Sequence, residues 1–220
     1  MAISKEEIKK NIVDQLFWDA RVDASGITVD FSDGVVVLSG TAPTYLAKQA
    51  AEQDTKAVPG VKSVRNEIFV RFPSGVLIPS DEEIKGNIKN VLAWDSNIDD
   101  SDIMVSVEKG EVVLDGSVPA FWQKVHAEGL AVNVNGVTYL HNRLSVVPSK
   151  HFVDELIARD IAAALDRTID INVNDIDIQV ENGNVVINGT VSNWTAYRTA
   201  ENFARLTDGV TDVINNLIIS

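Results

Sequence analysis

Cysteine is absent from this chain of 220 residues, which excludes disulfide bonds, thiolate metal sites and a cysteine nucleophile. Small secreted domains often depend on disulfides, so the absence of cysteine argues against secretion. Residues 1–10 are charged and do not have the apolar centre of a signal peptide. These two features favour a cytoplasmic location, or a periplasmic one if a signal peptide has been removed. Long apolar runs are also missing, so no transmembrane segment is expected.

Basic residues are scarce, with 19 Lys and Arg against 32 Asp and Glu, a net charge of −13. Binding to nucleic-acid phosphates depends on clustered Lys and Arg, so no nucleic-acid partner is expected. The deficit is uneven: residues 1–75 carry 9 basic and 10 acidic side chains, whereas residues 76–148 and 149–220 each carry 5 and 11. Anionic membranes are therefore disfavoured as partners of the last two thirds of the chain, but not of the first third.

The patterns of common catalytic and cofactor sites are missing too. The three histidines, His126, His141 and His151, have no Ser or Asp recurring beside them in a triad-like arrangement. No GxxxxGK[ST] or GxGxxG loop for nucleotide binding occurs. The sequence predicts a protein that is not an enzyme and has no cofactor and no metal site.

What the chain does contain is one pattern repeated three times. Residues 34–40, 110–116 and 183–189 align without gaps, at offsets of 76 and 73 residues. A fixed offset over such a length indicates one fold built three times, which we expect as domains at 1–72, 78–148 and 151–220. The recurring polar and glycine positions are Gly34, Gly40, Gly60 and Asn66, then Gly110, Gly116, Gly136 and Asn142, then Gly183, Gly189, Gly209 and Asn215.

Each copy predicts the order α-β-β-α-β. An apolar stripe such as Ile8, Ile12 and Leu16 indicates an amphipathic helix. Two strands joined by a glycine-containing hairpin turn follow, the second ending at Gly40 in the first copy. A second helix, stopping at Gly60, and a third strand parallel to the second complete the copy. The fold class is therefore α+β, with two helices on one face of a small three-stranded mixed sheet, and the recurring Asn is interpreted as an amide that ties backbone groups together.

The repeated pattern resembles the BON domain. The features that carry the resemblance are the V-V-x-L/I-x-G strand, the helix with Ala-Glu, and the later Gly-Val and Asn. The resemblance implies a non-enzymatic module that associates weakly and multivalently with phospholipid or envelope surfaces in osmotic or envelope stress. It implies phospholipid membranes or proteins as partners.

The first helix of the first copy is the candidate lipid-binding element. Lys5, Lys9 and Lys10 are expected to share one flank of it, and Trp18 stands at its end. Such an aromatic residue usually covers the edge of a core, but at a bilayer its ring lies at the level of the headgroups. Trp94 is its equivalent in the second copy and Arg167 in the third.

The alternative function is a soluble cytoplasmic stress module that binds an ion or a protein. Its candidate ligands are Asp99, Asp100 and Asp102. Residues 95–102 do not match a calcium-binding EF-hand loop, because Asp100 and Ser106 stand where Gly and Glu are required. An acidic loop of this kind is also typical of a solvated Asx turn.

Overall fold

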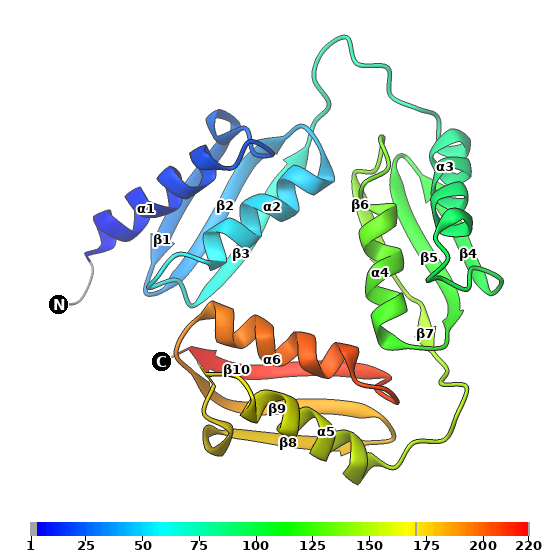
Figure 1. Cartoon of the computed structure of the whole chain (residues 1–220). Coiled ribbons are helices and arrows are strands. Elements are labelled where there is room, and N and C mark those ends of the chain that lie inside the picture. The colour runs from blue at the N-terminus through cyan, green and yellow to red at the C-terminus, as the bar shows by residue number, and fades with distance from the viewer. Residues whose placement is uncertain (1–3, 170, 220) are drawn as a thin grey trace. The chain divides into compact units, whose positions relative to one another are not determined.

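The computed structural model describes residues 4–169 and 171–219. Three copies of one α-β-β-α-β unit follow one another along the chain (Figure 1). The first repeat consists of α1 (Lys5–Trp18), β1 (Ile27–Ser32), β2 (Val35–Ala42), α2 (Tyr45–Lys56) and β3 (Ser63–Val70). The second consists of α3 (Asp81–Trp94), β4 (Ile103–Glu108), β5 (Glu111–Val118), α4 (Phe121–Ala131), β6 (Tyr139–Asn142) and β7 (Ser145–Val146). The third consists of α5 (Asp154–Asp166), β8 (Ile176–Glu181), β9 (Asn184–Val191), α6 (Trp194–Leu206) and β10 (Asp212–Ile219).

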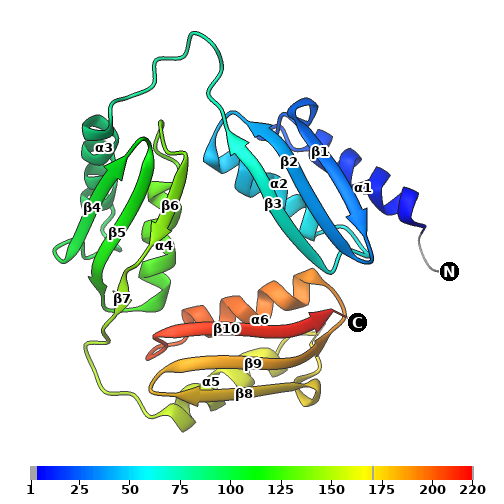
Figure 2. The ribbon, with the colours of Figure 1, turned by 180° about the vertical axis from the view of Figure 1, so that it is seen from behind.

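Each repeat has a mixed sheet with the same topology. In the first, β2 lies between β1, to which it is antiparallel, and β3, to which it is parallel. The third repeat follows the same rule, and in the second the final strand is divided into β6 and β7, both beside β5. Both helices of a repeat cover the same face of its sheet, and Figure 2 shows the opposite face. The predicted fold and the parallel pairing of the third strand are confirmed.

Local capping sets where the first helices begin. The Ser4 hydroxyl accepts a hydrogen bond of 3.2 Å from the Glu7 amide. Before α3, the Ser80 hydroxyl accepts from the Glu83 amide, and the Glu83 carboxylate accepts from the Ser80 amide at 2.8 Å. This reciprocal pairing satisfies amides that have no partner in the first turn of a helix.

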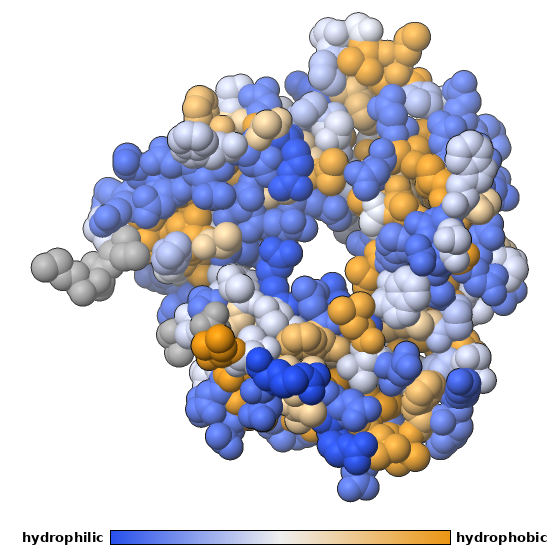
Figure 3. Space-filling model, in the orientation of Figure 1, coloured by the Kyte–Doolittle hydropathy of each residue, from blue (hydrophilic) through white to orange (hydrophobic). Residues whose placement is uncertain are grey.

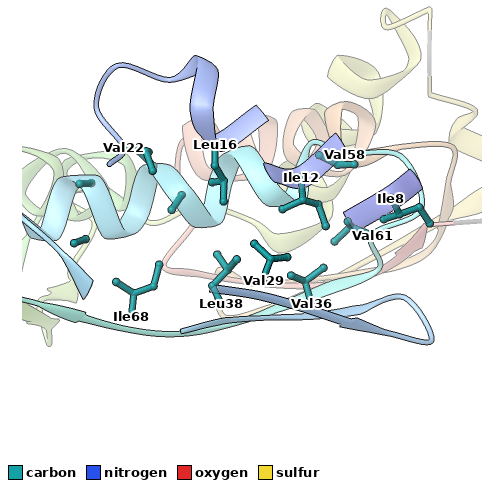
Figure 4. Close-up of a cluster of buried hydrophobic side chains, with 14 residues drawn as sticks. Ile8, Ile12, Leu16, Val22, Val29, Val36, Leu38, Val58, Val61 and Ile68 are labelled. Atoms are coloured by element: carbon teal, nitrogen blue, oxygen red, sulfur yellow. The ribbon is translucent and has the colours of Figure 1, made fainter. Parts of the chain in front are cut away.

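The core of each repeat lies between its helices and its sheet, as Figure 4 shows for the first. Ile12 of α1 and Leu38 of β2 are fully buried there. Burial of such a side chain stabilises the folded state by about 1.5–3 kcal/mol, so the apolar stripe holds α1 on the sheet. Outside the cores, Figure 3 shows hydrophilic and apolar residues interspersed on the visible face of each repeat.

The ends of two elements differ from the sequence prediction. β2 continues beyond Gly40 to Ala42, although Gly40 has a φ of 111°. A Cβ on Gly40 would lie 2.1 Å from the Gly26 carbonyl oxygen, so this glycine permits a close approach of two backbones inside the strand rather than ending it. α2 ends at Lys56, four residues before Gly60.

None of the helices in residues 4–169 and 171–219 has the length and apolar character needed to cross a membrane.

Candidate functional site

The recurring asparagine joins the second helix of its repeat to the third strand. Asn66 donates through Nδ2 to the Lys48 carbonyl oxygen at 2.9 Å and to Glu52 Oε2 at 3.2 Å. Its Oδ1 accepts from the Ile68 amide at 3.2 Å. The half-buried side chain thus uses its donor and its acceptor within the fold, which is a structural role.

The same bridge occurs in the other two repeats. Asn142 donates to the Lys124 carbonyl oxygen at 2.8 Å, and Asn215 donates to the Tyr197 carbonyl oxygen at 3.3 Å. Asn142 also donates to Glu128, whereas in the third repeat the corresponding Glu201 accepts from Arg205. The backbone part of the bridge is therefore common to all three repeats, and the carboxylate part is not.

The structure separates the four candidate lipid-binding residues of α1. Lys9 Nζ lies 3.7 Å from Asp30 Oδ1 of β1, while Lys10 Nζ lies 3.4 Å from Asp14 Oδ2 on the helix itself. Lys5 and Lys9 are four residues apart and line the same hollow, whereas Lys10 points about 100° away from its neighbour Lys9. Lys5 begins α1 and Trp18 ends it. A helix of this length places them about 20 Å apart.

Exposed apolar side chains gather on the last turns of α1. Val13, Phe17 and Trp18 are 45%, 79% and 83% exposed, and we call these three residues the α1 apolar surface. Lys10 lies next to Val13 and Phe17 on the helix, three and seven residues before them. Val13 and Phe17 escaped the sequence prediction. Their signal was present, because they are four residues apart and both fall outside the buried stripe.

The equivalent surface is smaller in the second repeat and polar in the third. Trp94 of α3 is 89% exposed, but Lys89 and Ala93 replace Val13 and Phe17. In α5 the equivalent residues are Ala162, Asp166 and Arg167. An exposed apolar surface beside a lysine therefore distinguishes the first repeat.

A group of charged side chains lies next to the end of α1. The Asp19 carboxylate accepts hydrogen bonds from the Arg21 amide and guanidinium, and this hydrogen bonding holds the pKa of Asp19 well below its usual range. Burial, together with the nearby Asp19 carboxylate, raises the pKa of Asp54 in α2 to about 6. One Asp54 oxygen, Oδ2, is buried without a hydrogen-bond partner in the part of the chain that the structure describes. This pair escaped sequence reasoning because 35 residues separate its members.

The acidic loop of the second repeat forms a local turn. Asp99 Oδ1 accepts from the Ser101 amide at 3.2 Å and from its hydroxyl at 2.6 Å, which lowers the pKa of Asp99. Asp23 and Ser25 make the same contacts in the first repeat. Asp100 and Asp102 are exposed. Across residues 4–169 and 171–219, no three His, Asp or Glu side chains are grouped closely enough to hold a metal ion.

One histidine has a carboxylate partner. His126 Nε2 lies 2.8 Å from Asp95 Oδ2. This contact joins α4 to the loop after α3. The corresponding residues to His126 in the other repeats are Ala50 and Thr199, so the pair is particular to the second repeat.

Two curated proteins are similar to this chain. Osmotically-inducible protein Y of Escherichia coli (strain K12) is 29% identical over 143 residues, which cover 62% of this chain and 71% of that protein. The 21 kDa hemolysin of Actinobacillus pleuropneumoniae is 31% identical over 137 residues, covering 61% of this chain and 70% of that protein.

Among solved structures, the C-terminal domain of CdsD, a structural protein of the type III secretion system of Chlamydia trachomatis, aligns with 99% of this chain and 100% of its own. Its identity is 17% and its TM-score is 0.28. The family model of the BON domain matches residues 4–71, 80–148 and 153–220. With nearly its whole length matched in three segments, this chain belongs to the BON domain family.

Proposed function

We propose that this chain is a non-enzymatic interaction protein that associates weakly with a phospholipid surface in osmotic or envelope stress. The stress context comes from its similarity to a protein named for its osmotic induction. Contact with the lipid occurs through the α1 apolar surface of the first repeat.

The α1 apolar surface is the observation that carries this proposal. Phe17 and Trp18 are large, exposed and neighbouring, although an isolated soluble domain gains nothing from their exposure. At the headgroup level of a bilayer the Trp18 ring has an apolar body in the acyl region and an N–H group among polar headgroups. Lys10, on the adjoining flank, adds a weak attraction to anionic lipid.

Charge supports the assignment to the first repeat. Residues 1–75 carry 9 basic and 10 acidic side chains, whereas residues 76–148 carry 5 and 11. An anionic membrane repels the second segment more strongly than the first. Trp94 is therefore a poorer anchor than Trp18, despite its similar exposure and its equivalent position.

Flotation of the full-length chain with vesicles tests the proposal. The vesicles contain either phosphatidylcholine alone or phosphatidylcholine with phosphatidylglycerol, at low salt. We expect wild-type protein to float with the anionic vesicles. The double variant Phe17→Ser/Trp18→Ser should lose about tenfold in partition, since partial burial of each ring contributes about 0.7 kcal/mol.

The matched control is Trp94→Ser, which removes an equally exposed tryptophan from the same position of the second repeat. We expect it to change the partition less than twofold. The proposal is overturned if neither vesicle retains the wild-type protein, or if Trp94→Ser weakens flotation as much as the double variant.

A further inference from the structure

The hairpin turn of the second repeat is bound by a carboxylate from the start of α3. The Lys109 amide donates to Asp81 Oδ2 at 2.7 Å, and the Gly110 amide donates to Asp81 Oδ1 at 2.9 Å. Asp81 is the first residue of α3. Two consecutive turn amides therefore point the same way and hold both oxygens of one carboxylate.

The third repeat has the same arrangement. The Asn182 and Gly183 amides donate to Asp154 Oδ2 and Oδ1 at 2.8 and 2.9 Å. Asp154 is the first residue of α5. The same recognition in two repeats, with different turn residues, shows that the turn backbone itself is a receptor for a carboxylate.

The first repeat has the receptor without its carboxylate. Its turn residues Asp33 and Gly34 have φ values of 52° and 86°, compared with 53° and 77° for Lys109 and Gly110. The residue that begins α1, however, is Lys5. Within residues 4–169 and 171–219, no side chain accepts a hydrogen bond from the Asp33 or the Gly34 amide.

Several basic side chains lie near this turn. Lys5 and Lys9 of α1 and Arg65 of β3 line one hollow together with Ser32 and Asp33. Lys62 packs against Gly34, with its Cδ 2.8 Å from the place that a Cβ on Gly34 would take. At the positions of Lys62 and Arg65 the second repeat has Thr138 and His141, and the third has Thr211 and Ile214.

Of the two acidic side chains in the same hollow, Asp30 forms an ion pair among the described residues and Asp33 does not. Asp30 lies 3.7 Å from the Lys9 ammonium, and Asp33 is part of the turn. Arg65 is 3.3 Å from Glu67 on the exposed face of β3. Lys5 forms no ion pair among the described residues. Its ammonium charge is therefore available at the position where the other two repeats carry the carboxylates of Asp81 and Asp154.

We propose that the Asp33–Gly34 turn binds a carboxylate from a partner protein, supplied by an acidic side chain or by a chain terminus. The two turn amides bind its oxygens, as they do in the other repeats, and Lys5 provides the opposite charge. The site lies at the other end of α1 from Phe17 and Trp18, so it does not rest on the association with lipid.

Amide chemical shifts of the full-length, ¹⁵N-labelled chain test this proposal with acetate as the probe. Sodium chloride keeps the ionic strength constant. We expect the Asp33 and Gly34 amides to shift saturably, with a dissociation constant in the millimolar range, while Gly110 and Gly183 stay unchanged. Inorganic phosphate at the same concentration forms a second arm, because a lipid headgroup would supply phosphate.

Two variants change the residue that begins the first helix of a repeat. Lys5→Asp supplies the missing carboxylate, and we expect it to abolish the response to acetate and to move the Gly34 amide toward the position that Gly110 has in the wild type. Asp81→Ala removes the carboxylate from the second turn, and Gly110 should then respond to acetate. The response should be about two- to fivefold weaker than that of Gly34, because no lysine at position 81 adds an exposed ion pair. The spectra of both variants also report whether the chain is folded.

Three outcomes overturn the proposal. The first is that Gly34 shows no saturable shift with acetate. The second is that Gly34 and Gly110 shift equally in the wild type. The third is that Lys5→Asp leaves the response to acetate intact. A response to phosphate without one to acetate overturns the assignment to a carboxylate and identifies a phosphate group as the ligand.

Discussion

The first repeat and the second have the same fold and different surfaces. In both, an apolar stripe on the first helix packs on the sheet, and a recurring asparagine joins the second helix to the third strand. Yet Lys5 begins α1 where Asp81 begins α3, and Phe17 is replaced by Ala93. Residues that recur are used by folding, so a distinct function has to come from the residues that differ.

The shared cores provide the largest expected effect and the first way to break this comparison. Ile12→Ala and Ile88→Ala each remove a fully buried side chain from the same helix position. Each should destabilise its own repeat by about 2–5 kcal/mol, from lost burial and the cavity left behind. Hydrogen exchange of the intact chain would show local opening of the affected repeat, and a large difference between the two variants would contradict a common core.

Substitutions of the residue that begins the first helix of a repeat should change stability less than the core substitutions do. The two substitutions should have effects of opposite sign in the second and the first repeat. Asp81→Ala leaves two amides without their charged acceptor and should destabilise the β4–β5 hairpin by about 1–2 kcal/mol. Lys5→Asp should stabilise the β1–β2 hairpin by about 1 kcal/mol. Exchange rates of the hairpin amides provide the measurement, and a destabilised hairpin in Lys5→Asp would show that the two turns are not equivalent.

Asp54 should make the stability of the first repeat depend on pH. Its pKa in the folded chain is about 6, above the ordinary 3.8, so the folded state favours the protonated carboxyl. The resulting stabilisation is complete below pH 3.8 and is lost as pH rises through 6. Asp54→Asn should therefore raise the stability above pH 6.5 by about 1 kcal/mol, after allowance for solvent screening, and change it little near pH 4.

Melting curves of the wild type and Asp54→Asn between pH 4 and 8 check this expectation. Leu130 occupies the equivalent position in the second repeat, so the opening of that repeat should not acquire the same pH dependence. A difference in melting temperature that is the same at every pH would mean that Asp54 is not held in its protonated form.

The smallest expected effect concerns the α1 apolar surface. Phe17→Ser and Trp18→Ser should each change the free energy of unfolding by less than about 0.5 kcal/mol, because both side chains are exposed. Chemical denaturation of the full chain is the measurement. A loss above 1 kcal/mol in Trp18→Ser would assign that ring to the edge of the core and weaken its role as an anchor.

Local patterns allowed most of the fold to be predicted. The spacing of Ile8, Ile12 and Leu16 predicts both a helix and its buried face, and a right-handed crossover predicts the parallel β2–β3 pair. The glycine motif predicts that β2 ends at Gly40, which is two residues too early. The motif alone does not reveal that the Gly26 carbonyl oxygen approaches Gly40 inside the strand.

The candidate sites were less predictable because they depend on distant contacts. Nothing local to Asp54 indicates that Asp19 is its neighbour, and nothing local to Asp81 indicates that it binds a turn 28 residues away. Comparison of the repeats offered one available signal, since Lys5 stands in register with two aspartates. A different signal was available for Phe17, namely its place outside the buried apolar stripe of α1.

Hydrogen exchange of the full-length chain, with and without vesicles that contain phosphatidylglycerol, tests the central claim most directly. The claim is that the repeats share a fold while the first alone supplies the lipid contact. It predicts that vesicles slow exchange in residues 13–18 and leave the equivalent residues of α3 and α5 unchanged. Equal protection of all three helices, or protection of α3 in place of α1, would contradict it.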